Sequence, residues 1–168
     1  FWARGYEATS VQDLVDCMGV NRGSLYATFG DKHSIFVEAL RRYDAIHREA
    51  WTAGLAKSTS PRQAIVGAFE EAITATIDHG SWDGCLLVNT ALELSPHDEK
   101  VAEIVSHGLA EMEEFFREMI EEGQRQGEIA QSVHSVDTAR SLLGLFIGLR
   151  VLSRSRPEAA LLRSIAKQ

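Results

Sequence analysis

Residues 9–32 read TSVQDLVDCMGVNRGSLYATFGDK, and this stretch decides the fold of the N-terminal part of the chain. In residues 11–18 the apolar positions recur at the three- and four-residue spacings of one helix face. Gly19 is a typical helix terminator, and Asn21 is a suitable N-cap for a second helix that runs to about residue 29. The stretch therefore predicts two short helices joined by a tight glycine turn, which is a helix-turn-helix.

The second of these helices has an apolar back, formed by Leu25 and Phe29, and a polar front. A helix held in this way can lie in a major groove with its N-terminal residues toward base edges. Arginine pairs with guanine, and hydroxyl groups contact base edges or phosphates. A plain pair of packed helices is the alternative, and the polar front disfavours it. The predicted DNA-binding residues are Ser10, Gln12, Asn21, Arg22, Gly23, Ser24, Tyr26, Thr28 and Lys32.

The remainder of the chain also has helical periodicity, and no stretch alternates as a strand does. Helices are expected from residue 31 to about 55, over 61–77, 84–94 and 97–126, from 135 or 137 and including the apolar segment 142–152, and from 157 onward. The fold class is therefore all-α. The first four residues begin in mid-pattern, so we expect the N-terminus to be truncated within a helix.

Composition restricts the function classes. The chain has 168 residues with a net charge of −7, and residues 1–50 hold six basic and seven acidic residues, so charge alone does not indicate a nucleic-acid partner. The longest apolar run, 142–152, is about half of the roughly 20 residues that span a bilayer, so no membrane partner is expected. The two cysteines, Cys17 and Cys85, are far apart, which suits a reducing cytoplasm. No metal-ligand spacing, cofactor motif or catalytic motif is present, so we expect no metal, no cofactor and no enzyme.

The run 142–152 is apolar on almost every side of its helix. Such a helix must be covered all round, which one small body does with difficulty, so a subunit interface is expected. Gly144 and Gly148 are four residues apart and would allow a partner helix to approach closely. The predicted dimer contacts are Leu142, Leu145, Gly148, Leu149 and Leu152.

The motifs Gly5-Tyr6, Thr9-Ser10-Val11 and 19–26, together with Phe29 and Lys32, resemble the DNA-binding signature of the TetR/AcrR repressors. The stretch 84–94 is similar to one found in a subgroup of that family. The resemblance implies a helix-turn-helix head (1–48, with its first helix incomplete), a linking helix, and a helical ligand-binding and dimerisation bundle (49–168). It also implies a homodimer that binds double-stranded DNA at a near-palindromic operator and is released by a small-molecule inducer, which the sequence does not identify.

Candidate inducer contacts are large apolar residues of the body and the polar residues of the otherwise apolar helix 84–94. Most of the apolar ones are expected to be core, whereas buried polar groups need partners, in the chain or in a ligand. Cys85 opens its helix and is either a reactive thiol or a small buried residue; Cys17 is expected to pack in the head. The candidates are Trp51, Phe69, Ile73, Leu86, Asn89, Thr90, Glu93, Met112, Phe115, Phe116 and Phe146.

Two other function classes remain open on sequence grounds. One is a helical small-molecule-binding or thiol-sensing module whose head does not bind DNA, a hypothesis motivated by the acidic balance. The other is an enzyme on a helical scaffold, for which converging acid–base groups in a pocket would be needed. The leading hypothesis is a DNA-binding repressor that a small molecule releases.

Overall fold

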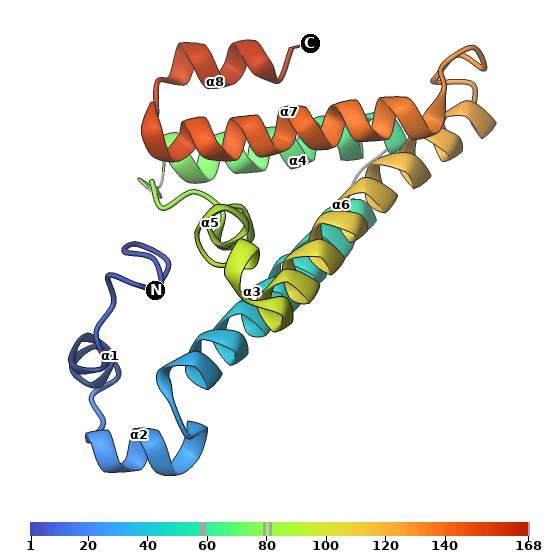
Figure 1. Ribbon diagram of the computed structural model, residues 1–168. Coiled ribbons are helices and arrows are strands. Elements are labelled where there is room, and N and C mark those ends of the chain that lie inside the picture. Colours follow the sequence, from blue (N-terminus) through green and yellow to red (C-terminus); the bar gives the residue numbers. More distant parts are fainter. Residues whose placement is uncertain (58–59, 79, 81, 168) are drawn as a thin grey trace.

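The computed structural model describes the backbone of residues 1–57, 60–78, 80 and 82–167 and, within these ranges, every side chain except those of residues 51, 52 and 55–57. The described residues contain helices and turns but no strand, as expected (Figure 1). The elements are α1 (Val11–Met18), α2 (Arg22–Phe29), α3 (Lys32–Lys57), α4 (Pro61–Ile77), α5 (Leu86–Glu93), the 3₁₀ turn η1 (Ser95–His97), α6 (Glu99–Arg125), α7 (Ser135–Ser155) and α8 (Ala159–Ile165).

The helix-turn-helix is formed by α1 and α2 with the caps that their sequence predicts. The Ser10 hydroxyl accepts the Asp13 N–H, and the Asp13 carboxylate accepts the Ser10 N–H, which completes a capping box. Gly19 ends α1 with a φ of 65°, a left-handed conformation that favours glycine. The Asn21 side chain accepts the Ser24 N–H at 2.7 Å and begins α2. Leu14 of α1, Leu25 of α2 and Ile35 of α3 form the small core that holds the head together.

The body is a bundle in which α4, α6 and α7 pack together and α8 covers α4 and α7 (Figure 1). Its core contains buried aromatic and aliphatic side chains from these four helices. Phe69 and Phe146 meet edge to face with ring centroids 5.4 Å apart, a favourable aromatic geometry. Within the described ranges, no helix combines the length and the apolar character that crossing a lipid bilayer requires.

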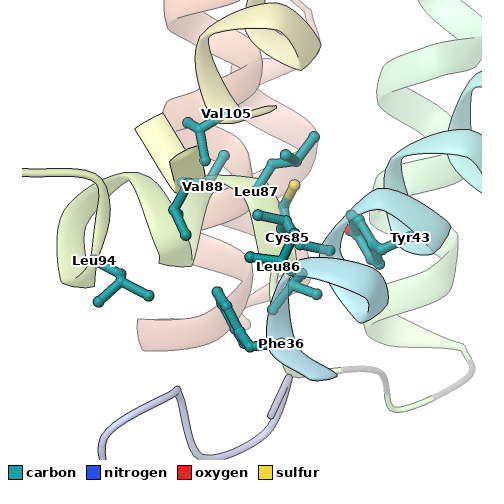
Figure 2. Close-up of a cluster of buried hydrophobic side chains, with 11 residues drawn as sticks. Phe36, Tyr43, Cys85, Leu86, Leu87, Val88, Leu94 and Val105 are labelled. Carbon is teal, nitrogen blue, oxygen red and sulfur yellow. The ribbon is translucent and has the colours of Figure 1, made fainter. Parts of the chain in front are cut away.

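The long helix α3 joins the head to the body without interruption. Phe36 and Tyr43 of α3 pack against residues 85–88 at the start of α5 and against Val105 of α6 (Figure 2). Phe1, Trp2 and Tyr6 of the N-terminal segment pack against the same cluster. The head and the body therefore share one core.

Several helix bounds differ slightly from those expected. Ser95–His97 forms a separate 3₁₀ turn, and α6 begins at Glu99 because the Asp98 side chain caps it by accepting the Val101 N–H. α7 begins at Ser135 and continues to Ser155, and α8 begins at Ala159 rather than at 157. These shifts leave the order and type of the elements as expected.

Candidate DNA-binding surface and ligand cavity

The polar front of α2 lies on the outside of the molecule, at the end remote from the body (Figure 1). Every residue of α2 is exposed except the buried Leu25 and the half-buried Phe29. Its first turn carries no acidic residue, so the arginine there faces solvent without a neighbouring carboxylate on its own helix. The structure thus places five predicted DNA contacts on one exposed helix: Arg22, Gly23, Ser24, Tyr26 and Thr28.

The other predicted DNA contacts flank this helix. Ser10 lies at the N-terminus of α1, where backbone N–H groups can face a phosphate. Gln12 is exposed, and its amide donates to Asp16 at 2.8 Å. The Lys32 ammonium lies 4.3 Å from the centroid of the Tyr6 ring, and this cation–π contact holds the start of α3 close to the N-terminal segment.

The predicted dimer contacts on α7 do not all face outward. Leu149 is fully buried in the core of its own chain, so assigning it to the dimer interface was wrong. The run 142–152 is apolar on many sides because α4, α6 and α8 cover most of them, and the apolar character alone could not separate the covered side from the free one. Leu145 and Val151 are more than a third exposed, and a side chain at Gly144 or Gly148 would meet no atom within 4 Å.

Two polar residues predicted to contact an inducer bind the chain's own backbone instead. Glu93 accepts the N–H groups of Tyr6 and Glu7, both at 3.0 Å, and so ties α5 to the N-terminal segment. Asn89 donates to the Asp83 carbonyl at 2.9 Å and holds the loop before α5. These partners lie in loops that the helical pattern of 84–94 does not reveal, and they satisfy both polar groups without a ligand.

The remaining candidates are spread over the body. Leu86, Thr90 and Phe116 are buried, and Phe115 meets Phe116 edge to face at 5.4 Å. Trp51 lies outside the side chains that the structure describes. Phe69 and Ile73 line depressions of about 260 and 340 Å³ on the side of α4 that faces α8. Two of the predicted contacts, Met112 and Phe146, line one cavity together.

That cavity has a volume of about 110 Å³ and lies between α3, α4, α6, α7 and the start of α5. Although the two depressions beside α8 are larger, we take this cavity as the candidate ligand site because it holds several buried polar groups among apolar walls, as ligand sites do. Its lining residues are Trp2, Tyr43, His47, Ala68, Glu71, Ala72, Ala75, Cys85, Met112, Phe146 and Arg150.

Sequence reasoning missed the polar part of this lining. Arg150 is only 9% exposed, and its guanidinium donates to the Gly84 carbonyl. The one arginine within the apolar run 142–152 was the signal that could have found it, because a buried charge needs a partner. Trp2 was interpreted only as the remnant of a truncated helix.

Burial changes the ionisation of two groups in the cavity. Burial, and then the neighbouring Cys85 thiol, raise the pKa of Tyr43 above its ordinary value, so its hydroxyl remains protonated near neutral pH (Figure 2). Burial, and then the charge of Arg150, lower the pKa of His47, which favours the neutral imidazole. Cys85 is buried as expected of a small core residue, whereas Cys17 is exposed, so the expectation that it packs in the head was wrong.

Asp44, His107 and Glu111 form a second polar cluster, where α3 meets α6, with potential metal-ligating atoms within 4.8 Å of one another. The Arg48 guanidinium lies between the two carboxylates, at 2.8 Å from Asp44 and 3.0 Å from Glu111. This cation bridges the acidic pair and offsets one of its two negative charges. We therefore interpret the cluster as an ion-pair network that holds α3 against α6.

Both parts of the chain match known families. Residues 1–39 match the family described as "Bacterial regulatory proteins, tetR family", and residues 61–167 match "Tetracyclin repressor-like, C-terminal domain". The chain is 31% identical over 153 residues to the HTH-type transcriptional regulator YezE of Bacillus subtilis (strain 168), covering 91% of this chain and 77% of that protein. It is 27% identical to the HTH-type transcriptional repressor ComR of Escherichia coli (strain K12), covering 99% and 80%.

Solved structures show the same architecture. A cysteine mutant of the TetR family transcriptional regulator CifR, in complex with 26-bp double-strand operator DNA, is 29% identical to this chain with a TM-score of 0.86, covering 99% of this chain and 87% of that one. The reduced form of E. coli NemR, at 21% identity and a TM-score of 0.87, shows the fold.

Proposed function

Because the chain belongs to the TetR family of bacterial transcriptional regulators, we propose that it represses transcription through α2, and that a small molecule in the cavity between α3, α4 and α7 releases it from DNA. The chain is a DNA-binding regulator of an all-helical family that acts as homodimers on operator DNA, and this family is not one of enzymes. The proposal adds which residues bind the DNA and where the inducer binds. We further propose a cytoplasmic location, which the two free cysteines support.

The exposed polar front of α2 is the single observation that carries the DNA-binding proposal. Arg22 and Ser24 lie in the first turn of that helix, where side chains of a recognition helix reach base edges. Tyr26, on the same helix, and Lys32, at the start of α3, contact DNA phosphates. The polar groups that position the two helices on the DNA are those of Ser10, Gln12, Asn21 and Thr28. Residues 1–48 form the DNA-binding domain in this proposal, and 49–168 the ligand-binding and dimerisation domain.

The exposed apolar positions of α7 support a dimer in which α7 of one protomer meets α7 and α8 of the other. Leu145 and Gly148 lie on the free side, with the half-buried Leu142 and Leu152 beside them. Two heads related by this two-fold axis meet successive major grooves of a near-palindrome, about one helical turn apart.

Binding to the chain's own promoter region tests the proposal, with fluorescence anisotropy measured at several salt concentrations. The wild type should lose affinity steeply as salt rises, because phosphate contacts release counterions. Arg22→Ala should weaken binding to the preferred site by about 1–3 kcal/mol and relax the preference at one base pair. Tyr26→Ala should weaken binding to all sequences alike. Arg62→Ala, an exposed arginine on α4, is the matched control and should change neither property.

Absence of binding by the wild-type dimer at low salt would favour the alternative, a helical sensing module without DNA binding. An Arg22→Ala variant with unchanged base preference would place the recognition surface elsewhere in the head.

A further inference from the structure

The cavity between α3, α4 and α7 contains a buried cation that is not neutralised within the chain. Arg150 takes part in none of the ion pairs found among the described residues. Its guanidinium donates a hydrogen bond to the backbone carbonyl of Gly84, which carries no net charge. A buried charge without a counter-charge is costly, and a guanidinium has five donors arranged to fit a carboxylate. An anion in the cavity would supply the missing charge.

A second side chain of the cavity, Trp2, can only donate a hydrogen bond, as Arg150 can. The indole Nε1 of Trp2 is buried and is the single side-chain N or O atom in the described part of the chain found buried without a hydrogen-bond partner. Tyr43 retains its phenolic proton near neutral pH, as argued above. An indole N–H can only donate, so the ligand group that meets it must be an acceptor.

The walls of the cavity limit the remainder of the ligand. Ala68, Ala72 and Ala75 of α4 line one side with methyl groups, and Met112 and Phe146 line others. The volume of about 110 Å³ is below the roughly 150 Å³ of a dry apolar cavity that binds benzene. The ligand is therefore smaller than a substituted benzene, and its apolar body is no larger than a short alkyl chain.

We infer that this cavity binds a small organic monocarboxylate, with its carboxylate toward Arg150 and the Trp2 indole and its apolar body toward α4 and Phe146. This inference rests on the proposed function, since it names the chemical class of the inducer. Glu71 also lines the cavity, but it is exposed. Its charge, at the solvent side, disfavours ligands with a second carboxylate and so favours monoacids.

The position of Trp2 connects such a ligand to the DNA-binding head. Trp2 belongs to the N-terminal segment, and its carbonyl accepts a hydrogen bond from Arg154 of α7 at 3.2 Å. Its ring meets Tyr43 of α3 edge to face at 4.9 Å. A carboxylate that binds the indole N–H therefore contacts the head directly, and coupling needs only a preference for one of two head positions.

Calorimetry with propionate and butyrate, each compared with its neutral amide, tests the ligand class in the absence of DNA. We expect the acids to bind the wild-type protein at least 10-fold more tightly than propionamide and butyramide. Arg150→Met should lower the affinity for the acids by about 10- to 100-fold, the range expected for a charge-assisted hydrogen bond, and should leave the amides unchanged. Arg140→Met, an exposed arginine on the same helix, is the control and should bind like the wild type.

The Trp2 indole provides a second measurement that holds even if Arg150→Met fails to fold. The ¹H–¹⁵N resonance of its Nε1, assigned with Trp2→Phe, should move on addition of butyrate and move much less with the same concentration of butyramide. Equal binding of acids and amides, or no binding of either acid up to about 10 mM, where a ligand of this size should bind a fitting site, would overturn the inference. In that case, modification of Cys85 by an alkylating electrophile with release of DNA would indicate a thiol-based signal in place of a carboxylate ligand.

Operator binding, measured separately, distinguishes this inference from the proposed function. If the protein binds its operator but neither acid, the ligand class is wrong and the DNA-binding function stands. If the acids bind but leave operator affinity unchanged, the ligand class stands and the proposed release mechanism is wrong.

Discussion

Replacing Glu93 by glutamine should loosen the N-terminal segment from the body. The Glu93 carboxylate accepts the N–H groups of Tyr6 and Glu7, both at 3.0 Å. Glu93→Gln keeps one acceptor oxygen but turns an NH₂ group toward the other N–H and removes the charge. Since hydrogen bonds to charged groups contribute about 1.5–3 kcal/mol, and one of these two is exposed, we expect a loss of about 2 kcal/mol in unfolding free energy.

Urea denaturation at a fixed protomer concentration measures this loss, since the stability of a dimer depends on concentration. Hydrogen exchange at the amides of Tyr6 and Glu7 should also become faster in Glu93→Gln. Glu103→Gln, an exposed carboxylate of α6, is the control and should stay within about 0.5 kcal/mol of the wild type. If Glu93→Gln matched that control in both measurements, the two hydrogen bonds would not hold the segment.

Gly5 provides an independent test of the same contact. A Cβ at this position would lie 2.6 Å from a carboxylate oxygen of Glu93, and its φ of 86° is unfavourable for other residues. Gly5→Ala should therefore cost more than the roughly 1–2 kcal/mol of the left-handed conformation alone. Combined with Glu93→Ala, which removes the clashing carboxylate, it should cost less than the sum of the two single changes. Strict additivity would contradict the contact.

Three further expectations follow from other contacts. Gly108→Ala should destabilise the protein by about 1–2 kcal/mol in urea denaturation, because its Cβ would lie 2.7 Å from Asp44 and 2.9 Å from Leu87. This overpacking should outweigh the helix-propensity gain of about 1 kcal/mol. Gly67→Ala, where no atom lies within 4 Å of the added Cβ, is the control and should be neutral or stabilising. Gly148→Asp should shift the protein from dimer to monomer in analytical ultracentrifugation, because a charge would enter the apolar face of α7, and a variant that stays dimeric would move the interface elsewhere. The pKa of Asp98 is lowered from its ordinary 3.8, first by the backbone N–H groups at the start of α6. Its stabilising contribution is therefore present above pH 3.8 and is lost as the pH falls through the lowered pKa. Asp98→Asn should make the unfolding free energy depend less steeply on pH on the acid side, and an unchanged pH dependence would refute this.

The features that could be predicted from sequence are those whose partners are close in the chain. The Ser10–Asp13 capping box and the Asn21 cap each join residues three positions apart, so the pattern contains both partners. The resemblance of residues 5–32 to the family motif rests on the same local signals. This is why the helix-turn-helix and its exposed polar front agree with the expectation.

The features that sequence reasoning missed depend on partners far along the chain. Glu93 accepts hydrogen bonds from Tyr6 and Glu7, which lie 87 and 86 positions earlier in the chain. The local pattern therefore shows only an unusual polar residue in an apolar helix. Leu149 and Leu145 belong to the same apolar run, and the packing of α4, α6 and α8 decides which of them is covered. The cavity joins Trp2 to Arg150, a separation that no periodicity spans.

The core that the head shares with the body has a consequence for hybrid repressors. A designer who exchanges heads between such proteins at residue 48 would keep the carboxylate of Glu93 and the guanidinium of Arg154 in the retained sensor. A foreign head would fit only if it offers a glycine where Gly5 lies and an aromatic ring where Trp2 lies. The sensor thus imposes a sequence requirement on any DNA-reading module grafted onto it, both in the first seven residues and in the part of α3 that carries Phe36 and Tyr43.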